Sequence, residues 1–346
     1  MLYRQRTLDL PHGDVETPIL LPVRNVGKRS SDNTPEYVGT IPDLPTAMIN
    51  ARSIYQRAPM WERLQEGVTL REEMEVPEDT IVFADSGGLD FDPTGPDITP
   101  AEMLSIQRHL DADIYGTIDI PLSRENWVEE NHRRVRQNIE YAIQTSEKHR
   151  EDDASLLFAS VHGYDPETVR NNIQHLEQRG DFDGYALGSL SLIRTDYKKT
   201  TRLILAARRA TDKHLHVYGL GGITYLPLLL YLGVDSFDSS AFIRNAGNRN
   251  YLLPGFGGKE LHNIDHLDYL PCPCPVCGTR TLDEIRVDRN LLVRHNLWSM
   301  VTELRRFRYI AASDKDVEAY LDLRFQDNEV TQRAYRAAKQ QVRRLV

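Results

Sequence analysis

Cysteine is nearly absent from this chain of 346 residues: only three occur, and all lie in the stretch PCPCPVCG at 271–278. An odd number of thiols at such short spacing cannot build a framework of disulfides. Reduced, clustered cysteines in an otherwise thiol-free chain are typical of cytoplasmic proteins. The cysteine usage therefore excludes a secreted, disulfide-stabilised scaffold, and we expect a cytoplasmic protein.

Long apolar runs are also missing. No run approaches the roughly 20 residues that a membrane-spanning helix needs, and the opening MLYRQRTLDLPHGDVE lacks the apolar core of a signal peptide. With 40% hydrophobic and 27% charged residues, the composition is that of a soluble globular protein. We expect no membrane partner, and a chain of this length predicts one large barrel with an insertion or two domains.

The three cysteines indicate a metal site that lacks one ligand. Cys272, Cys274 and Cys277 offer soft thiolates, which favour Zn²⁺ with a fourth donor that is most often histidine. His295 in RVDRNLLVRHNLW is the nearest candidate downstream. Four protein ligands leave no position for a catalytic water, so this zinc would be structural. The alternative is three buried or free cysteines without a metal.

The net charge of -9 argues weakly against a nucleic-acid partner, yet basic residues gather locally. No acidic residue follows Glu329, whereas five basic residues do, namely Arg333, Arg336, Lys339, Arg343 and Arg344. A second cluster, LRRFRY at 304–309, mixes three arginines with two aromatic residues, namely Arg305, Arg306, Arg308, Phe307 and Tyr309. Such patches can contact phosphates even on an acidic protein. Each patch alone is equally consistent with a solvated helix face.

Apolar, β-branched runs recur along the chain, each closed by Gly, Pro, Ser or Asp, with helical patterns between several of them. Eight runs predict strands, at 17–23, 46–51, 80–87, 113–119, 155–163, 184–190, 214–222 and 235–242. Helices are predicted at 99–112, 125–150, 165–180, 196–213, 224–233 and near 284–312. Thr99 before Pro100 and Asp165 before Pro166 are helix-start signals.

Continuous apolar strands that alternate with helices imply a parallel sheet buried on both faces, and eight of them predict a TIM (β/α)8 barrel. The cysteines follow the eighth strand and so belong to a zinc-binding insertion. We predict the (β/α)8 barrel at 1–260, a zinc-binding subdomain at 261–300 and C-terminal helices that complete the barrel at 301–346. Between the first and third strands the pattern is poor, and 32–35 and 89–100 are predicted as loops.

The predicted strand ends are acidic and rich in glycine. Asp85, Asp119 and Asp238 end or lie within the third, fourth and eighth strands. In such a barrel, catalytic groups sit at the carboxyl ends of the strands, so these carboxylates would converge on one mouth. Two carboxylates with separated pKa values can divide nucleophilic and acid/base work. The alternative for each aspartate alone is a turn or a helix cap.

The motifs ADSGG, DIP, ALGSL, VYGLGG, FDSS and C-x-C-x2-C followed by His occur here in the order that they have in the guanine transglycosylases. Over roughly residues 17–300 the chain resembles this family, whose best-known members are the tRNA-guanine transglycosylases. The resemblance implies a TIM barrel with a zinc-binding insertion. It also implies exchange of a guanine in a nucleic acid for a free 7-deazaguanine of the preQ0 type, without ATP.

The resemblance further implies roles for residues at matching positions. Asp238 matches the nucleophile, which attacks the anomeric carbon, and Asp85 matches the acid/base for the departing and entering bases. Asp119 matches the aspartate that pairs with the N–H edge of the base. The remaining matches are the pocket-lining positions Ser86, Gly188, Ser189, Leu190 and Gly219, and Arg244 near the nucleic acid.

Several positions depart from the family pattern. Leu89 and Asp90 replace the usual aromatic and amide, so stacking on the base is assigned to Tyr218, and Ser189 replaces the second glycine of a paired-glycine turn. The compact chain with altered nucleic-acid contacts is most similar to the branch that places 7-deazaguanines in DNA. We therefore prefer DNA, with tRNA as the alternative, and leave open a homodimer or an accessory protein.

Two other functions agree less well with the sequence. A metal-dependent barrel hydrolase would need ligand clusters at the strand ends, but the first predicted strand, TPILLPV, has no histidine. A non-catalytic subunit that binds nucleic acid would have lost the nucleophile, whereas Asp85 and Asp238 are both present. Both readings are less favoured than an active pentosyltransferase.

Overall fold

The structure is a computed structural model that describes residues 1–24, 41, 44–88, 96–123, 128–149, 153–190, 196–255, 261–313 and 316–343. The altered positions Leu89 and Asp90, the predicted loop at 32–35, most of the one at 89–100, and Arg344 lie outside these residues. The chain divides into two compact units. The barrel unit contains Arg4–Gly219 and Val234–Asp238, and the carboxy-terminal unit contains Met1–Tyr3, Leu220–Gly233 and Ser239–Val346. The predicted boundaries at 260 and 300 stay predictions.

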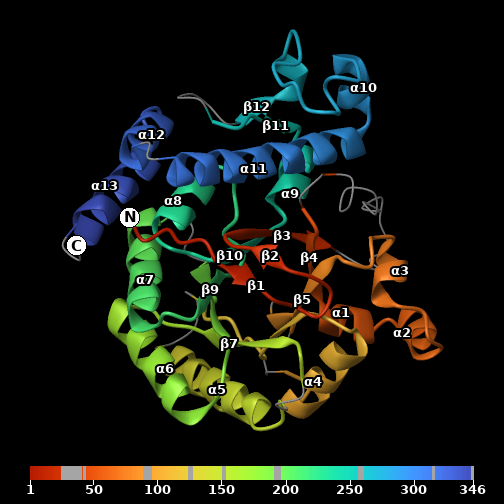
Figure 1. The fold of residues 1–346 in the computed structure, drawn as a ribbon, viewed down its shortest axis with the longest axis vertical. Coiled ribbons are helices and arrows are strands. Elements are labelled where there is room, and N and C mark those ends of the chain that lie inside the picture. Colours follow the sequence, from red (N-terminus) through yellow and green to blue (C-terminus); the bar gives the residue numbers. More distant parts are fainter. Residues whose placement is uncertain are drawn as a thin grey trace. The chain divides into compact units, whose positions relative to one another are not determined.

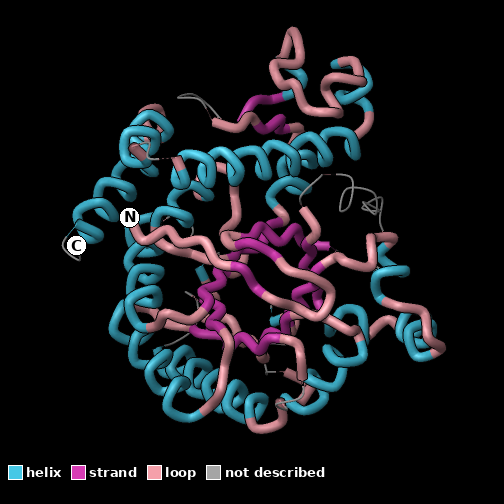
Figure 2. Tube along the Cα trace, viewed as in Figure 1, coloured by secondary structure: helices cyan, strands magenta, loops and turns pink. Residues whose placement is uncertain are grey.

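Eight strands form a closed barrel, in which each strand from β3 to β10 pairs in parallel with the next one along the chain. They are β3 (Ile19–Arg24), β4 (Thr46–Asn50), β5 (Ile81–Asp85), β6 (Ile114–Gly116), β7 (Leu156–Val161), β8 (Gly184–Leu187), β9 (His214–Val217) and β10 (Ser236–Ser239). All eight predicted strands and the TIM-barrel prediction are confirmed. In Figure 2 the strands form one ring.

The continuous apolar runs reflect burial on both faces of the strands. On one face, side chains from several strands fill the interior of the barrel, including Leu21, Phe83 and Phe158. On the other face, residues such as Leu20 and Val82 are equally inaccessible. A strand buried on both sides has no polar face, and this is why the runs do not alternate.

The fourth barrel strand is shorter than predicted. It ends at Gly116 rather than at residue 119. Beyond it, the Asp119 N–H donates to Ser86 Oγ, and the Ile120 N–H donates to the side chain of Asn138. Because these backbone groups bond to side chains, the chain leaves the strand ladder before it reaches Asp119.

Four helices of the barrel unit lie outside the ring of strands (Figure 1). They are α4 (Pro100–His109), α5 (Val128–Ser146), α6 (Pro166–Arg179) and α7 (Tyr197–Ala210). Both predicted start signals are confirmed: Thr99 caps α4 in a capping box with Glu102, and Asp165 caps α6 ahead of Pro166.

The segment between the second and third barrel strands contains three short helices that the sequence pattern did not predict. They are α1 (Ala51–Tyr55), α2 (Ala58–Gln65) and α3 (Leu70–Met74). Helices of five to eight residues show too few turns for periodicity to register. The hairpin of β1 (Thr7–Leu8) and β2 (Val15–Glu16) was not predicted either, because strands of two residues are too short to show an alternating pattern. Its Leu8 and Val15 pack against the interior cluster of the barrel.

The carboxy-terminal unit is organised around one long helix, α11 (Arg289–Ala312), which contacts α8, α9, α10, α12 and β11. Its other elements are α8 (Leu226–Tyr231), α9 (Ala241–Gly247), β11 (Asn250–Leu252), β12 (Leu261–Asn263), a 3-10 helix (Ile264–His266), α10 (Leu282–Val287), α12 (Val317–Arg324) and α13 (Glu329–Arg343). The single helix predicted near 284–312 is instead two helices, α10 and α11, because Asp288 ends the first and is the N-cap of the second.

Four side chains of α11 bind the backbone of residues 252–255. Asn296 and Glu303 accept the N–H groups of Leu252 and Gly255 at 2.9 Å, and Ser299 and His295 contact the Leu252 carbonyl. Glu303 also forms a fully buried ion pair with Arg324 of α12 at 2.7 Å (N–O). In the described part of the chain no helix combines the length and apolarity needed to cross a bilayer.

Candidate active site and candidate metal centre

Three carboxylates gather in the barrel unit, as the sequence predicted. Asp85 is the last residue of β5, Asp238 lies in β10, and Asp119 follows β6. Asp119 and Asp238 are only 8% and 7% exposed. The charges of both raise the pKa of Asp85, so the three carboxylates lie within electrostatic reach of one another.

The environment of Asp85 favours the protonated form of its carboxyl group. Burial, followed by the nearby charges of Asp119 and then Asp238, raises the pKa of Asp85 to about 8. The Gly87 N–H, 3.2 Å from Oδ2, acts in the opposite direction. At neutral pH Asp85 is therefore mostly a neutral acid that can donate a proton.

Asp238 is held by the turn after β9. The Gly219 N–H donates to Asp238 Oδ1 at 2.6 Å. Gly219 has a φ of 68°, a left-handed conformation that a residue without a side chain adopts at little cost. A second nitrogen, His216 Nε2, lies 3.5 Å from the same carboxylate oxygen.

Asp119 is fixed from two sides. Its N–H donates to Ser86 Oγ at 3.1 Å. The predicted pocket residue Ser86 therefore helps to hold the backbone of Asp119. A Cβ added to Gly88 would lie 1.9 Å from the Asp119 carbonyl oxygen, so only glycine fits there. His162 Nε2 lies 2.8 Å from Asp119 Oδ1, although neither of these buried atoms has a well-aligned hydrogen bond.

The predicted pocket residues Gly188, Ser189 and Leu190 line one cavity of about 140 Å³ in the barrel unit. Ser189 has a φ of 61°, unusual for a residue with a side chain, where the family has a glycine. Its Oγ accepts from the Leu122 N–H at 2.8 Å and lies 2.8 Å from His162 Nδ1. The serine that departs from the family pattern thus secures His162.

Tyr218 is directed into the barrel. Its ring packs against Phe83 and His216, with centroids 6.1 Å and 4.8 Å away. A Cβ added to Gly116 would lie 2.7 Å from the Tyr218 hydroxyl, so this glycine makes room for the ring. Burial raises the pKa of Tyr218 well above its usual value. The predicted stacking of Tyr218 on a base stays a prediction.

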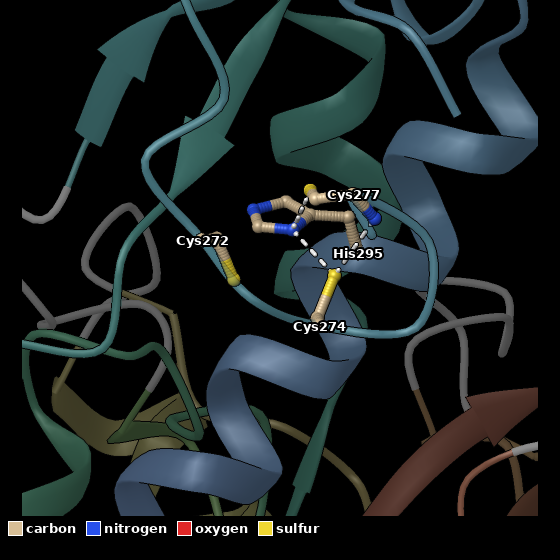
Figure 3. A group of neighbouring side chains, drawn as sticks. All are labelled: Cys272, Cys274, Cys277 and His295. Atoms are coloured by element: carbon tan, nitrogen blue, oxygen red, sulfur yellow. Dashed lines mark hydrogen bonds between the residues drawn. The ribbon is translucent and has the colours of Figure 1, made fainter. Parts of the chain in front are cut away.

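The predicted zinc ligands come together in the carboxy-terminal unit (Figure 3). Sγ of each of Cys272, Cys274 and Cys277 and a ring nitrogen of His295 all lie within 4.8 Å of one another. His295 Nδ1 is 3.4 Å from both Cys274 Sγ and Cys277 Sγ. Three cysteines and one histidine, all buried except the partly exposed Cys277, fit a tetrahedral structural metal site.

The surroundings of His295 orient its ring. Nε2 lies 2.8 Å from the Leu252 carbonyl oxygen, so this nitrogen carries the proton and Nδ1 keeps its lone pair for a metal. The Tyr251 ring stacks on the imidazole with centroids 3.7 Å apart, and the Tyr251 hydroxyl lies 3.1 Å from Cys277 Sγ. Tyr251 was not predicted, because no motif or spacing in the sequence marks it as a neighbour of the metal ligands.

The predicted nucleic-acid contacts are only partly described. Arg244 is exposed on α9 of the carboxy-terminal unit, and its role stays a prediction. In α13, Lys339 and Arg343 contact Glu318, and Arg333 pairs with Glu329 within the helix. Arg306 of α11 donates to the Gly255 carbonyl at 2.6 Å. These local partners favour the alternative in which the basic clusters form solvated helix faces.

The comparison with known families decides the identity. The model of the TGT family, described as queuine tRNA-ribosyltransferase, matches residues 2–327. The chain belongs to this family.

Three similar members of the TGT family are named tRNA-guanine(15) transglycosylase. The protein from Methanosarcina mazei is 27% identical over 313 residues, which are 86% of this chain and 60% of the relative. The relative from Aeropyrum pernix is 28% identical over 86% of this chain and 57% of its own length. The relative from Haloferax volcanii is 28% identical over 75% of this chain and 51% of its own length. The chain therefore spans between half and about 60% of the length of these relatives.

Two histidines at the site of this TGT-family chain had no predicted role. They are His162 and His216. For His216 the signal lies in the strand pattern, since HLHV places His214 and His216 on the same face of β9. The rings of both β9 histidines pack against Phe83 and Phe158 of the interior cluster, so they face the interior of the barrel.

Proposed function

We propose that the chain is a guanine transglycosylase, which exchanges guanine in a nucleic acid for a free 7-deazaguanine through a covalent intermediate on Asp238. One observation carries this proposal. A carboxyl group with a pKa raised to about 8, Asp85, lies within electrostatic reach of Asp238, whose oxygen accepts a backbone N–H at 2.6 Å. Acid and nucleophile are thereby provided by two carboxyl groups in different environments.

The reaction follows from these environments. Asp238 attacks the anomeric carbon of the target nucleoside, the bond to guanine breaks, and Asp85 gives its proton to the departing base. The sugar is then held as an ester of Asp238. The entering base loses a proton to Asp85, and its nitrogen attacks the same carbon, which releases the Asp238 carboxylate. Asp119, next to the site and mostly buried, accepts hydrogen bonds from the N–H edge of the base.

For the nucleic acid we now favour tRNA. The names of the relatives support the tRNA alternative better than the DNA preference that the altered motifs suggested. The hypothesis of a DNA substrate still rests on the three positions that differ from the family pattern, Ser189, Leu89 and Asp90. To reach the pocket, the target base must leave its stack in either nucleic acid.

Zn²⁺ is the metal that we assign to Cys272, Cys274, Cys277 and His295, in a structural role. Among the described residues this is the one group with a metal-binding arrangement, and it contains none of the three carboxylates. A metal-dependent hydrolase is therefore not favoured. Solubility in the cytoplasm, a homodimer and an accessory protein remain expectations.

The decisive experiment is exchange of radiolabelled guanine by the purified chain, on bulk tRNA and on plasmid DNA in parallel. We expect label to enter tRNA, and an Asp238→Ala protein to transfer none. Label in DNA alone would restore the DNA reading. Label in neither substrate, with a folded and metal-loaded protein, would overturn the proposed function for the chain acting alone.

A further inference from the structure

A line of polar side chains leads through the barrel to Asp238. His214 and His216 share one face of β9, and Ser236 and Asp238 share one face of β10, because side chains two apart in a strand point the same way. Ser236 lies directly opposite His216 in the register of the two strands. The rings of His214 and His216 contact Phe158 and Phe83, with centroids 4.8 Å and 4.9 Å away, so the line lies inside the barrel.

The members of this line are linked in sequence. His214 Nε2 lies 2.7 Å from Ser236 Oγ, and Ser236 Oγ lies 2.8 Å from His216 Nδ1. At the far end, His216 Nε2 is 3.5 Å from Asp238 Oδ1. His216 and Ser236 are completely buried. Within the described residues, His216 Nε2 has no hydrogen-bond partner, although it points toward a carboxylate.

One arrangement of protons satisfies the whole line. Burial lowers the pKa of both histidines, that of His214 to about 3, so both rings are neutral and each carries one N–H. An ionised Asp238 only accepts, so the His216 proton belongs on Nε2 and its Nδ1 accepts from the Ser236 hydroxyl. The Ser236 oxygen in turn accepts from His214 Nε2. The direction of donation therefore runs from His214 to Asp238.

We propose that His216 is a positioning residue for the nucleophile, with its tautomer set by Ser236 and His214. The inference rests on the proposed function, in which Asp238 attacks the sugar. Gly219 N–H and His216 Nε2 both address Oδ1, and the described residues make no hydrogen bond to Oδ2. Two donors on one oxygen orient the carboxylate and leave Oδ2 as the attacking atom. The gap of 3.5 Å shortens when the substrate is bound, as apo active-site contacts commonly do.

His216 also serves the second half of the reaction. Once Oδ2 is esterified, Oδ1 is the carbonyl oxygen of the ester and still accepts the same two N–H groups. When the entering base attacks the sugar, the bond from carbon to Oδ2 breaks and negative charge returns to the carboxylate. Donors that are already in place stabilise this leaving group without any reorganisation.

The test compares three histidine variants in single-turnover formation of the denaturation-resistant adduct. His216→Phe keeps an aromatic ring but removes the donor, and we expect adduct formation to slow about 10- to 100-fold. The KM for free guanine should stay within about twofold, because Asp119 and not Asp238 recognises the base. His216→Gln, whose amide nitrogen can reach toward Asp238, should restore most of the rate. His175→Phe, an exposed histidine of α6, is the matched control and should react like the unaltered protein.

Two results would overturn the proposal. An unchanged rate for His216→Phe would show that the donor is unnecessary, and a His216→Gln protein as slow as His216→Phe would assign the loss to packing. If His216→Phe fails to fold, the ¹⁵N signals of the histidine rings in the unaltered protein decide instead. We expect His216 to be neutral with its proton on Nε2, and a proton on Nδ1 would contradict the inference. This measurement needs no substrate, so it remains informative even if no adduct forms and the proposed function fails.

Discussion

The candidate active site and the candidate metal centre are assembled in opposite ways. Three of the four metal ligands lie within six consecutive residues, and the fourth, His295, is 18 residues further on in one helix. The three carboxylates are spread over more than 150 residues of sequence, between Asp85 and Asp238, and only closure of the barrel brings them together. Local sequence spacing defines the metal centre, whereas the topology of the barrel defines the active site. Substitutions in the active site should therefore impair the chemistry, whereas substitutions in the metal centre should impair folding.

The largest effect is expected at the proposed nucleophile, Asp238. Asp238→Ala should abolish both the covalent adduct and guanine exchange, because it removes the carboxylate on which the ester is proposed to form. The measurement is electrophoresis under denaturing conditions after incubation with tRNA or DNA, which detects the proposed ester of Asp238. The thermal midpoint and the metal content should stay close to those of the unaltered protein. An Asp238→Ala protein that exchanges guanine at the original rate would sink the mechanism.

At the metal centre the loss should be one of folding. Cys274→Ser removes a fully buried ligand, and we expect less than one equivalent of zinc together with a lower thermal midpoint. Metal analysis and thermal unfolding on the same preparation test this expectation. A well-folded, active protein without zinc would remove the assignment.

The third prediction uses the raised pKa of Asp85. The folded protein keeps the Asp85 proton between the ordinary carboxyl pKa of 3.8 and about 8, where the unfolded chain has lost it. The contribution of Asp85 to stability therefore falls as pH rises through this window. Asp85→Asn should flatten this decline and raise the thermal midpoint most near pH 8.

In the proposed mechanism, Asp85 should also set the pH dependence of activity. Exchange by the unaltered protein should fall above pH 8 as Asp85 loses the proton that the departing guanine needs. Asp85→Asn should lose about 100- to 10,000-fold in exchange at every pH. A pH profile that stays flat from 6 to 9 in the unaltered protein would speak against this role.

A smaller effect is expected for base recognition. Asp119→Asn keeps the shape of the side chain but removes the charge and one accepting oxygen. We expect the KM for guanine to rise about 10- to 100-fold with the fold intact. Competition between guanine and hypoxanthine, which lacks the 2-amino group, measures the loss of discrimination. Unchanged kinetics would show that Asp119 has been assigned wrongly.

The smallest effect should come from the surroundings of the metal. Tyr251→Phe removes the hydroxyl that lies 3.1 Å from Cys277 Sγ but keeps the ring stacked on His295. Outer-shell partners of this kind typically contribute 10- to 100-fold to metal affinity. Chelator competition should therefore show faster zinc loss, without the unfolding expected for Cys274→Ser.

The barrel was predictable because each strand is a short apolar run with a clear end. The metal ligands were predictable because their spacing is itself the signal. Sequence reasoning failed where local context did not decide the outcome. The exact end of β6 depends on Ser86 and Asn138, which capture backbone groups from other parts of the chain. His162 and His216 gain partners only once the barrel closes.

The four backbone contacts made by α11 constrain how this part of the chain can evolve. The backbone of residues 252–255 is bound by four side chains at fixed spacing along the helix, those of His295, Asn296, Ser299 and Glu303. Insertion of a single residue between positions 296 and 299 would rotate everything beyond it by about 100° about the helix axis. Ser299 and Glu303 would then lose their partners while His295 kept its own. Substitutions on the outer face of α11 should be tolerated, but insertions and deletions within 295–303 should not.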